Sequence, residues 1–236
     1  MNALAGRRIL ITGVSRGVGL ETARLFLAEG AEILGVARDA GRLERARREL
    51  DPDGSRLSVL AVDVGEKSAP AALASAVATR WGALDVLFNN AGVQIDGGTL
   101  GITTGDEAVL ETAMTTNLTA PYRLCRALLP ALERGREPRI VNVSSGAGNL
   151  ASMQLTDIPT YRLSKWALNG LTLLLAGELR GRVSVNAFDP GWVKTDLGGP
   201  RAPGSPTESA VGALALVTLP FAESGKFWKD GAEIPF

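Results

Sequence analysis

Apolar and polar residues alternate along the chain in short blocks that predict strands and helices in turn. Residues 8–12 are an apolar run that leads into glycine, which is typical of a buried strand. Residues 18–29 carry apolar side chains at helical spacing and end at Gly30, as a helix commonly does. The same criteria predict strands at residues 32–37, 57–62, 84–88, 139–143 and 182–188, and helices at about residues 41–50, 68–80, 106–134 and 159–179.

Strands that alternate with helices favour an α/β fold, in which helices cover both faces of a parallel sheet. The sequence contains no internal repeat and no linker that would divide it. We therefore expect one doubly wound domain of the Rossmann type over residues 1–236.

Residues 198–206 form the clearly irregular stretch of the chain, with three glycines and three prolines. A helix start follows it, with Ser205 as N-cap, Pro206 at the first helical position and Glu208 placed to complete a capping box. Because this composition permits hinges, we expect a lid over the substrate site at about residues 197–212. An ordinary surface loop is the alternative.

The amino-acid composition excludes several kinds of catalytic and structural site. The chain has no histidine and a single cysteine, Cys125, which excludes an internal disulfide, a Ser-His-Asp triad and a His-ligated metal. We therefore expect no metal site and a reducing, cytoplasmic environment. Lysine plus arginine equals aspartate plus glutamate, 25 of each, so net charge gives no reason to expect a nucleic acid or a membrane surface as partner. No apolar run is long enough to span a bilayer, and no signal sequence precedes the first strand.

A glycine-rich turn joins the first predicted strand to the first helix. Its sequence, Thr-Gly-Val-Ser-Arg-Gly-Val-Gly, covers residues 12–19. Gly13 would allow the tight turn, Gly17 would let the backbone approach a pyrophosphate, and Gly19 would let the helix pack on the strand. The helix N-terminus then offers free N–H groups to phosphates. This position in an alternating chain predicts dinucleotide binding, although a purely structural turn would also contain glycines.

The end of the second strand bears on the choice of dinucleotide. An acidic residue there favours NAD, whereas Arg38 matches the 2′-phosphate of NADP by charge and by paired donors. Arg16, inside the glycine turn, is placed to reach the same phosphate. These two cations favour NADP(H). Asp39 is an argument for NAD(H), and both arginines could simply be solvated.

Tyr161 and Lys165 are four residues apart, so a helix would place them on the same face. A free phenol has a pKa near ~10, too high for a good base at neutral pH, and a nearby ammonium favours the phenolate. In a chain without histidine, this pair is the best candidate for acid–base chemistry.

Four motifs in order resemble the short-chain dehydrogenase/reductase family, in its non-extended branch. They are the glycine turn, Asn89-Asn90-Ala91-Gly92 after the fourth strand, Tyr161 with Lys165, and Pro190-Gly191 with Thr195. The match runs from about residue 7 to residue 196; each motif alone is weak, but four in this order are specific. The segment after Gly191 and the C-terminal tail look more like the small carbonyl reductases related to the bacterial C-signal protein.

The resemblance implies a role for each matching residue. Tyr161 would donate the proton in reduction and accept it in oxidation, and Lys165 would bind the nicotinamide ribose and lower the pKa of the phenol. Ser145 would hydrogen-bond the substrate carbonyl, and Asn117 would hold a water that links Lys165 to solvent. Ser144 also fits the serine role, and Asn117 also fits a helix residue satisfied by backbone.

The residues expected to contact the cofactor share these motifs and the ends of the strands. They are Gly13, Ser15, Arg16, Gly17, Val18, Gly19, Arg38, Asp63, Val64, Asn90, Ala91, Gly92, Tyr161, Lys165, Pro190, Gly191, Val193 and Thr195.

The expected function is NADP(H)-dependent hydride transfer between the nicotinamide and an aldehyde, a ketone or the corresponding alcohol. Residues 149–158, which lengthen the segment between Ser145 and Tyr161, would lie over the substrate. The alternatives are a non-catalytic NADP(H)-binding sensor or signalling protein, and an epimerase or lyase, which would need a larger C-terminal part. The resemblance further suggests a homodimer, with a tetramer possible, built on the helices at 106–134 and 159–179. The apolar residues considered for that interface are Leu124, Leu128, Leu132, Leu171, Leu174 and Leu175.

Overall fold

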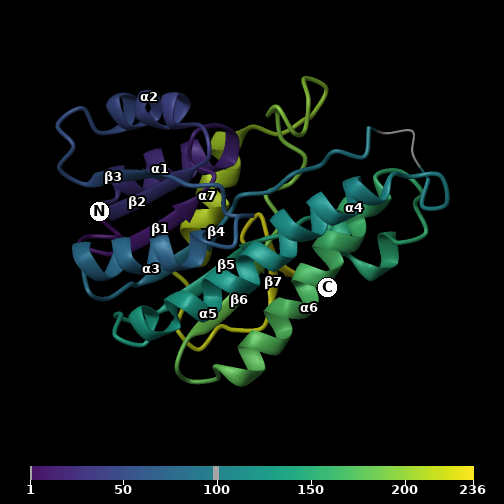
Figure 1. Ribbon diagram of the computed structural model, residues 1–236. Helices are drawn as coiled ribbons and strands as arrows, with labels where there is room; N and C mark the ends of the chain where they lie inside the picture. Colours follow the sequence, from purple (N-terminus) through teal and green to yellow (C-terminus); the bar gives the residue numbers. More distant parts are fainter. Residues whose placement is uncertain (1, 98–100) are drawn as a thin grey trace.

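The computed structural model describes residues 2–97 and 101–236 (Figure 1). Its strands form one sheet in the order β3-β2-β1-β4-β5-β6-β7-β8, in which neighbouring strands are parallel except for the antiparallel pair β7 and β8. The strands are β1 (Arg8–Thr12), β2 (Glu32–Ala37), β3 (Leu57–Ala61), β4 (Val86–Asn89), β5 (Arg139–Val143), β6 (Ser184–Phe188), β7 (Phe227–Lys229) and β8 (Ala232–Ile234). The strand order reverses between β1 and β4, and ligands of doubly wound folds bind at the carboxyl ends of the strands beside such a point.

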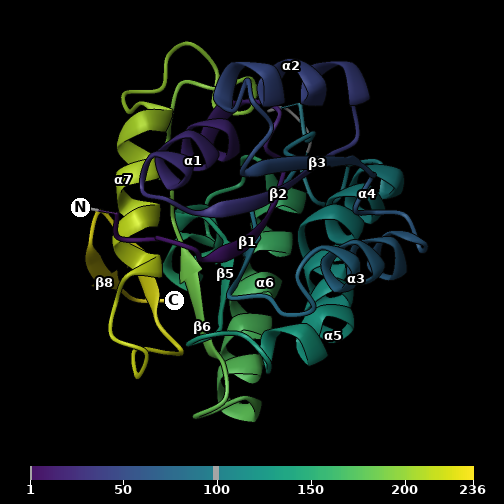
Figure 2. The same cartoon turned by 90° about the vertical axis from the view of Figure 1, so that its left-hand side faces the viewer.

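Helices cover both faces of the sheet (Figure 2). They are α1 (Gly17–Ala28), α2 (Ala40–Leu50), α3 (Ala69–Arg80), α4 (Glu107–Met114), α5 (Ala120–Leu132), α6 (Pro159–Glu178) and α7 (Pro206–Val217). Residues of α1 and α7 pack with one core cluster, and residues of α3, α5 and α6 pack with the other. The doubly wound α/β prediction is confirmed.

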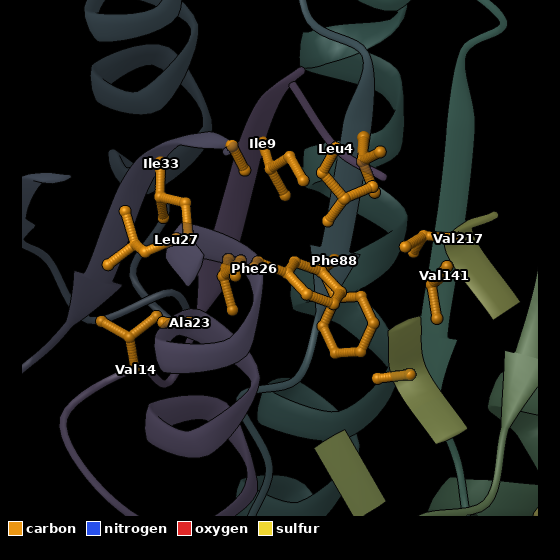
Figure 3. Packing of buried hydrophobic residues seen from close by; sticks show 14 of the residues in the cluster. Leu4, Ile9, Val14, Ala23, Phe26, Leu27, Ile33, Phe88, Val141 and Val217 are labelled. Carbon is orange, nitrogen blue, oxygen red and sulfur yellow. The ribbon is translucent and has the colours of Figure 1, made fainter. Parts of the chain in front are cut away.

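Aromatic rings join the strands to the helix layer on the α1 side (Figure 3). Phe26 of α1 meets Phe88 of β4 edge to face, with ring centroids 6.0 Å apart. Phe88 also contacts Phe188 of β6, at 6.5 Å. All three rings are fully buried, so α1 and the strands that carry the candidate site form one packed unit.

The predicted helix at 106–134 is one helical stretch, but not one regular α-helix. Between α4 and α5 the residues Thr115–Thr119 form a π-helical turn, η1, which contains Asn117. Single π-helical turns inside α-helices are frequent at functional sites. In the C-terminal tail, for which no element was predicted, the short strands β7 and β8 extend the sheet.

The apolar residues considered for an interface prove to serve two purposes. Leu124, Leu128 and Leu132 of α5 are buried in the core of the single chain, so these three are not available for an interface. Leu174 is 74% exposed on α6, and Trp166 of the same helix is 48% exposed. The predicted start of α7 is confirmed, because the Glu208 N–H donates to Ser205 Oγ and the Ser205 N–H donates to Glu208 Oε2.

Among the described residues, no helix combines the length and apolar character that crossing a membrane requires.

Candidate active site

The glycine turn has the backbone geometry that the sequence predicts. Gly13 has φ +77°, a conformation that glycine adopts without steric cost. A Cβ added to Gly19 would lie 2.2 Å from the Gly13 carbonyl oxygen, so only glycine fits where α1 begins. Asn90 fixes this turn from the next motif, since its Nδ2 donates to the Thr12 carbonyl oxygen over 2.8 Å. The turn is therefore rigid and tightly packed, as a cradle for a pyrophosphate must be.

The two arginines predicted to bind the 2′-phosphate of the cofactor lie in different surroundings. Arg38 follows β2, is exposed, and has no recorded ion pair or hydrogen bond within the described part of the chain. Arg16 is exposed but forms an ion pair with Asp196, from the segment after β6. Asp39, the residue that argues for NAD(H), is the N-cap of α2: its Oδ1 accepts from the Arg42 N–H over 2.9 Å. Asp39 is thus engaged in the fold, and Arg38 is the charge that is available at the end of β2.

The other predicted cofactor residues lie at the carboxyl ends of neighbouring strands. Asp63 follows β3, is exposed and accepts from the Gly65 N–H over 2.9 Å, whereas Val64 is buried in the core. Ser15, Val18, Ala91, Pro190 and Gly191 are half-buried beside their motifs.

The segment after β6 closes against the glycine turn. A Cβ added to Gly17 would lie 3.1 Å from Thr195 Cγ2, so the two predicted cofactor motifs are in contact. Pro190 is fixed to α7, because Ser209 Oγ donates to its carbonyl oxygen over 2.5 Å. Val193 pairs with Gly204 in an isolated parallel bridge, which closes the base of the loop that contains Arg201.

Part of the range predicted for a lid lies in a packed helix. Residues 206–212 belong to α7, where Ser209 and Ala210 are buried, so packing fixes this part of the predicted range. The rest of the predicted range, residues 197–205, belongs to the loop between β6 and α7, which is drawn in olive at the top of Figure 1.

Tyr161 and Lys165 lie on one face of α6, and both are buried. Lys165 Nζ donates to the Val143 carbonyl oxygen over 2.7 Å and lies 5.6 Å from the centre of the Tyr161 ring. The two candidate serines differ in their partners. Ser144 is buried and its Oγ donates to Asn169 Oδ1 over 2.6 Å, whereas Ser145 is half-buried and its Oγ accepts only from the Ala147 N–H among the described residues. The geometry therefore favours Ser145, since Ser144 is committed to α6.

Asn117 lies in the π-helical turn and faces the same site. Its Oδ1 accepts from the Val93 N–H, and its Nδ2 donates to the Val93 carbonyl oxygen and to Ser164 Oγ, each over 2.9 Å. A Cβ added to Gly92 would lie 3.3 Å from Asn117 Oδ1 and 3.4 Å from Lys165 Nζ. Asn117 and Lys165 thus approach the same backbone position, which a side chain there would obstruct.

Burial dominates the protonation of the pair. It raises the pKa of Tyr161 to about 12, and the interaction with the Ser145 hydroxyl offsets only part of this effect. Burial also lowers the pKa of Lys165 to about 8, against the opposing charge of Asp189. Desolvation therefore sets the direction of the pKa shift of Tyr161 in the cofactor-free protein, opposite to the direction expected from a nearby ammonium.

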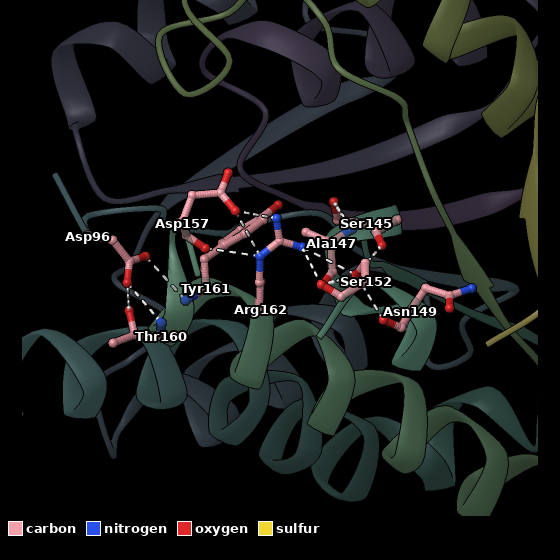
Figure 4. A network of polar contacts seen from close by, with 10 residues as sticks. Asp96, Ser145, Ala147, Asn149, Ser152, Asp157, Thr160, Tyr161 and Arg162 are labelled. Carbon is pink, nitrogen blue, oxygen red and sulfur yellow. Dashed lines mark hydrogen bonds and ion pairs between the residues drawn. The ribbon is translucent and has the colours of Figure 1, made fainter. Parts of the chain in front are cut away.

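Two buried carboxylates in the site were not among the predicted residues. Asp96 accepts from the Thr160 N–H and Oγ1 and from the Tyr161 N–H, so it holds the first turn of α6 (Figure 4). Asp189 follows β6; its Oδ1 accepts from the Gly191 N–H, and its Oδ2 lies 3.7 Å from Lys229 Nζ of β7. No local motif marks either residue, although an acidic residue next to Pro190 was a weak signal.

The segment between Ser145 and Tyr161 is fastened to α6 by Arg162. This buried guanidinium donates to the Asp157 carbonyl oxygen over 2.9 Å and to Ser152 Oγ over 3.2 Å (Figure 4). Within the segment, Leu150 and Leu155 are 63% and 58% exposed. An ordered loop with an apolar surface therefore flanks the candidate catalytic residues.

Comparisons with known proteins identify the family of this chain. The family model for short chain dehydrogenase matches residues 7–205. The chain is 30% identical to (+)-neomenthol dehydrogenase of Arabidopsis thaliana, over 92% of this chain and 93% of that protein. It is 32% identical to the 3-oxoacyl-(acyl-carrier-protein) reductase of Pseudomonas aeruginosa, over 98% of this chain and 93% of that protein. The NADPH-bound carbonyl reductase from chicken fatty liver has a similar structure, with a TM-score of 0.90 and 29% identity over 99% of this chain and 100% of that one. The chain therefore belongs to the short-chain dehydrogenase family of oxidoreductases.

Proposed function

We propose that this protein is an NADP(H)-dependent oxidoreductase that interconverts a carbonyl compound, an aldehyde or ketone, and its alcohol. The observation that carries the proposal is the buried pair of Tyr161 and Lys165 on α6, beside Ser145 and Gly92. Its similarity to carbonyl reductases from chicken and from Drosophila melanogaster, each 29% identical, supports the same reaction class.

The residues of the site fit a dinucleotide with a 2′-phosphate. The rigid glycine turn would hold the pyrophosphate, and Asp63 and Val64 would hold the adenine end. Arg38 would hold the 2′-phosphate, with Arg16 as a second donor once it leaves Asp196. Asn90, Ala91, Gly92 and the segment from Pro190 to Thr195 would line the nicotinamide half. When bound, the cofactor supplies or accepts the hydride.

In reduction, Tyr161 is the proton donor. A phenol with a pKa of about 12 keeps its proton at neutral pH, so the acid is present in the correct form before substrate binds. Ser145 Oγ is half-buried and has capacity to donate a hydrogen bond to the carbonyl oxygen, where negative charge grows. Both donors are held by the fold, so no reorganisation is required at the moment of reaction.

After proton transfer the phenolate needs a compensating charge and a new proton. Lys165 Nζ is fixed 5.6 Å from the ring centre and supplies that charge in its protonated form. Asn117, whose side chain lies beside the same glycine as Lys165, would hold a water between the ammonium and solvent. In oxidation the same groups act in reverse.

We further propose a homodimer in a cytoplasmic environment. Tyr122 of α5 and Trp166, Leu173 and Leu174 of α6 are exposed on neighbouring helices, and such an apolar surface favours pairing with a second copy.

NADPH consumption against a panel of aldehydes, ketones and quinones tests the proposal. Turnover that requires Tyr161 supports a reductase, whereas tight NADPH binding without turnover of any member would favour a sensor. We also propose that the protein is related to the carbonyl reductases of the C-signal type. Turnover of aldehydes or ketones in the same panel would support this relationship.

A further inference from the structure

A cavity of about 530 Å³ lies at the amino ends of the strands, opposite to the candidate active site. Arg7 immediately precedes β1 and Arg139 begins β5, whereas the glycine turn and Ser145 follow the other ends of these strands. Its lining also includes Arg136 and the residues Val217 to Leu219 at the end of α7. This cavity is therefore separate from the dinucleotide site.

The charged lining of the cavity is mainly positive. Three arginines, Arg7, Arg136 and Arg139, face one carboxylate, Glu137, whose side chain is 60% exposed. Asp85 is buried nearby, but its oxygens accept from the side chain and backbone of Arg8 and from the Arg136 N–H. Glu137 Oε2 also lies 3.9 Å from Arg139 Nη2. The two carboxylates thus leave a surplus of positive charge, which is buried at Arg7 and Arg139 and exposed at Arg136.

Arg139 is the least satisfied of these residues. It is 3% exposed, and its Nη2 donates to the Leu219 carbonyl oxygen over 2.6 Å. Its Nε and Nη1 are buried and have no hydrogen-bond partner within the described residues. Arg7 differs, because its two terminal nitrogens donate to the carbonyl oxygens of Arg136 and Glu137. A buried guanidinium with unused donors is costly unless a further acceptor is present.

The pKa values of the two buried arginines, Arg139 and Arg7, reflect their burial and the positive charges around them. Burial lowers the pKa of Arg139, and the charge of Arg7 lowers it further. Burial likewise lowers the pKa of Arg7; the charge of Asp85 opposes this effect, and the charges of Arg136 and Arg8 add to it. A bound anion would offset both the cost of burying these charges and their mutual repulsion.

We propose that this cavity binds a phosphate group, free or as part of a small phosphorylated metabolite, through Arg139, Arg7 and Arg136. A multivalent oxyanion matches the charge surplus, and guanidinium groups pair with phosphate oxygens in bidentate geometry. Residues Asn2 to Ala5 line the rest of the cavity and leave room for a small organic body beside the phosphate. Binding there stabilises the amino ends of β1 and β5 in the folded state.

Thermal unfolding in the presence of saturating NADP⁺ tests the proposal, because the dinucleotide site is then occupied. The melting temperature is followed against inorganic phosphate, and in a second series against glycerol 1-phosphate, with sodium chloride added to constant ionic strength. We expect a saturable rise in melting temperature. If glycerol 1-phosphate half-saturates the site at a lower concentration than inorganic phosphate, the remaining cavity holds an organic body. If inorganic phosphate half-saturates it at the lower concentration, the site binds the free ion.

Arg139→Met removes the central donor, and Arg136→Met removes an exposed donor without disturbing the core. Each variant is expected to raise the half-saturating phosphate concentration at least about tenfold, the usual scale for a hydrogen bond to a charged group. Arg180→Met, at an exposed arginine beyond α6, is the matched control and should behave as the unmodified protein. A linear response shared by all four proteins, or full saturation in Arg136→Met and Arg139→Met, would overturn the proposal.

Discussion

Lys165 Nζ donates a hydrogen bond to the carbonyl oxygen of Val143 over 2.7 Å. Val143 is the last residue of β5, and Ser145 follows it by two positions, so this bond joins the tyrosine-bearing helix to the strand that presents the serine. The bond also orients a buried ammonium whose pKa is lowered to about 8. The hydrogen bond therefore fixes the position of the Lys165 ammonium, and burial at that position lowers its pKa.

The lowered pKa of Lys165 predicts a specific pH dependence of stability in the cofactor-free protein. Between about 8, the folded pKa, and 10.5, the ordinary value, the unfolded chain binds the proton more tightly than the folded one. Stability therefore rises with pH in this range, because the cost of burying the ammonium is relieved. Cys125 acts oppositely above pH 9.0, since burial raises its pKa from 9.0 to about 12.

The effect of Lys165 on stability is therefore best measured between pH 8 and 9, below the range in which Cys125 opposes it. Denaturant unfolding should give a larger free energy at pH 9 than at pH 8, and Lys165→Met should remove this increase. An increase of the same size in the variant would assign it to another group.

Arg38→Asp should weaken the binding of NADPH at least about tenfold and leave NADH nearly unchanged, because it replaces a charged hydrogen-bond donor by a repelling carboxylate. Isothermal titration with both cofactors measures this. Arg48→Asp makes the same charge change at a 73% exposed arginine of α2 and serves as the control. Equal weakening of NADPH and NADH by Arg38→Asp would show that Arg38 does not contact the 2′-phosphate.

The loop of residues 195–203 should become protected when cofactor binds. Its base is fixed by the Lys194 N–H, which donates to the Gly204 carbonyl oxygen over 3.0 Å, whereas Arg201 is exposed. Trypsin should cut after Arg201 in the free protein, and saturating NADP(H) should slow this cut more than the cut after Arg180. Unequal protection supports a lid; the same rate at Arg201 with and without cofactor would make it an ordinary loop.

The exposed face of α6 should hold the homodimer together. Leu174→Arg places a charge at a side chain that is 74% exposed in the single chain, and it should convert a dimer into a monomer at micromolar concentration. Val211→Arg, at a 59% exposed residue of α7, should leave the dimer intact. Light scattering distinguishes these outcomes, and a monomeric unmodified protein would contradict the proposed assembly.

Local signals explain which features could be predicted from the sequence. Gly13 marks a backbone conformation that favours glycine, and Gly19 marks a position where a Cβ would not fit. Ser205 with Glu208 marks a helix start within four residues. Asp96 could not be found in this way, because it contacts Thr160 across 64 positions and only packing brings them together. β7 and β8 have three residues each, too few for an alternating pattern.

The pKa of Tyr161 is another property that the sequence alone could not predict. Its spacing from Lys165 correctly places both on one helix face, but spacing carries no information about burial. The phenol is 8% exposed, and this desolvation reverses the direction in which its pKa was expected to move.

The most direct test of the proposed function is the NADPH-dependent carbonyl reduction rate of Tyr161→Phe. This change removes the proton donor and keeps the ring, so the melting temperature and NADPH affinity should be retained while kcat falls at least about 100-fold, the scale of general acid catalysis. Tyr122→Phe is the matched control, because the chain has two tyrosines and Tyr122 is exposed on α5. A Tyr161→Phe enzyme that keeps kcat within a few-fold of the unmodified protein would contradict the assignment of Tyr161 as the catalytic acid.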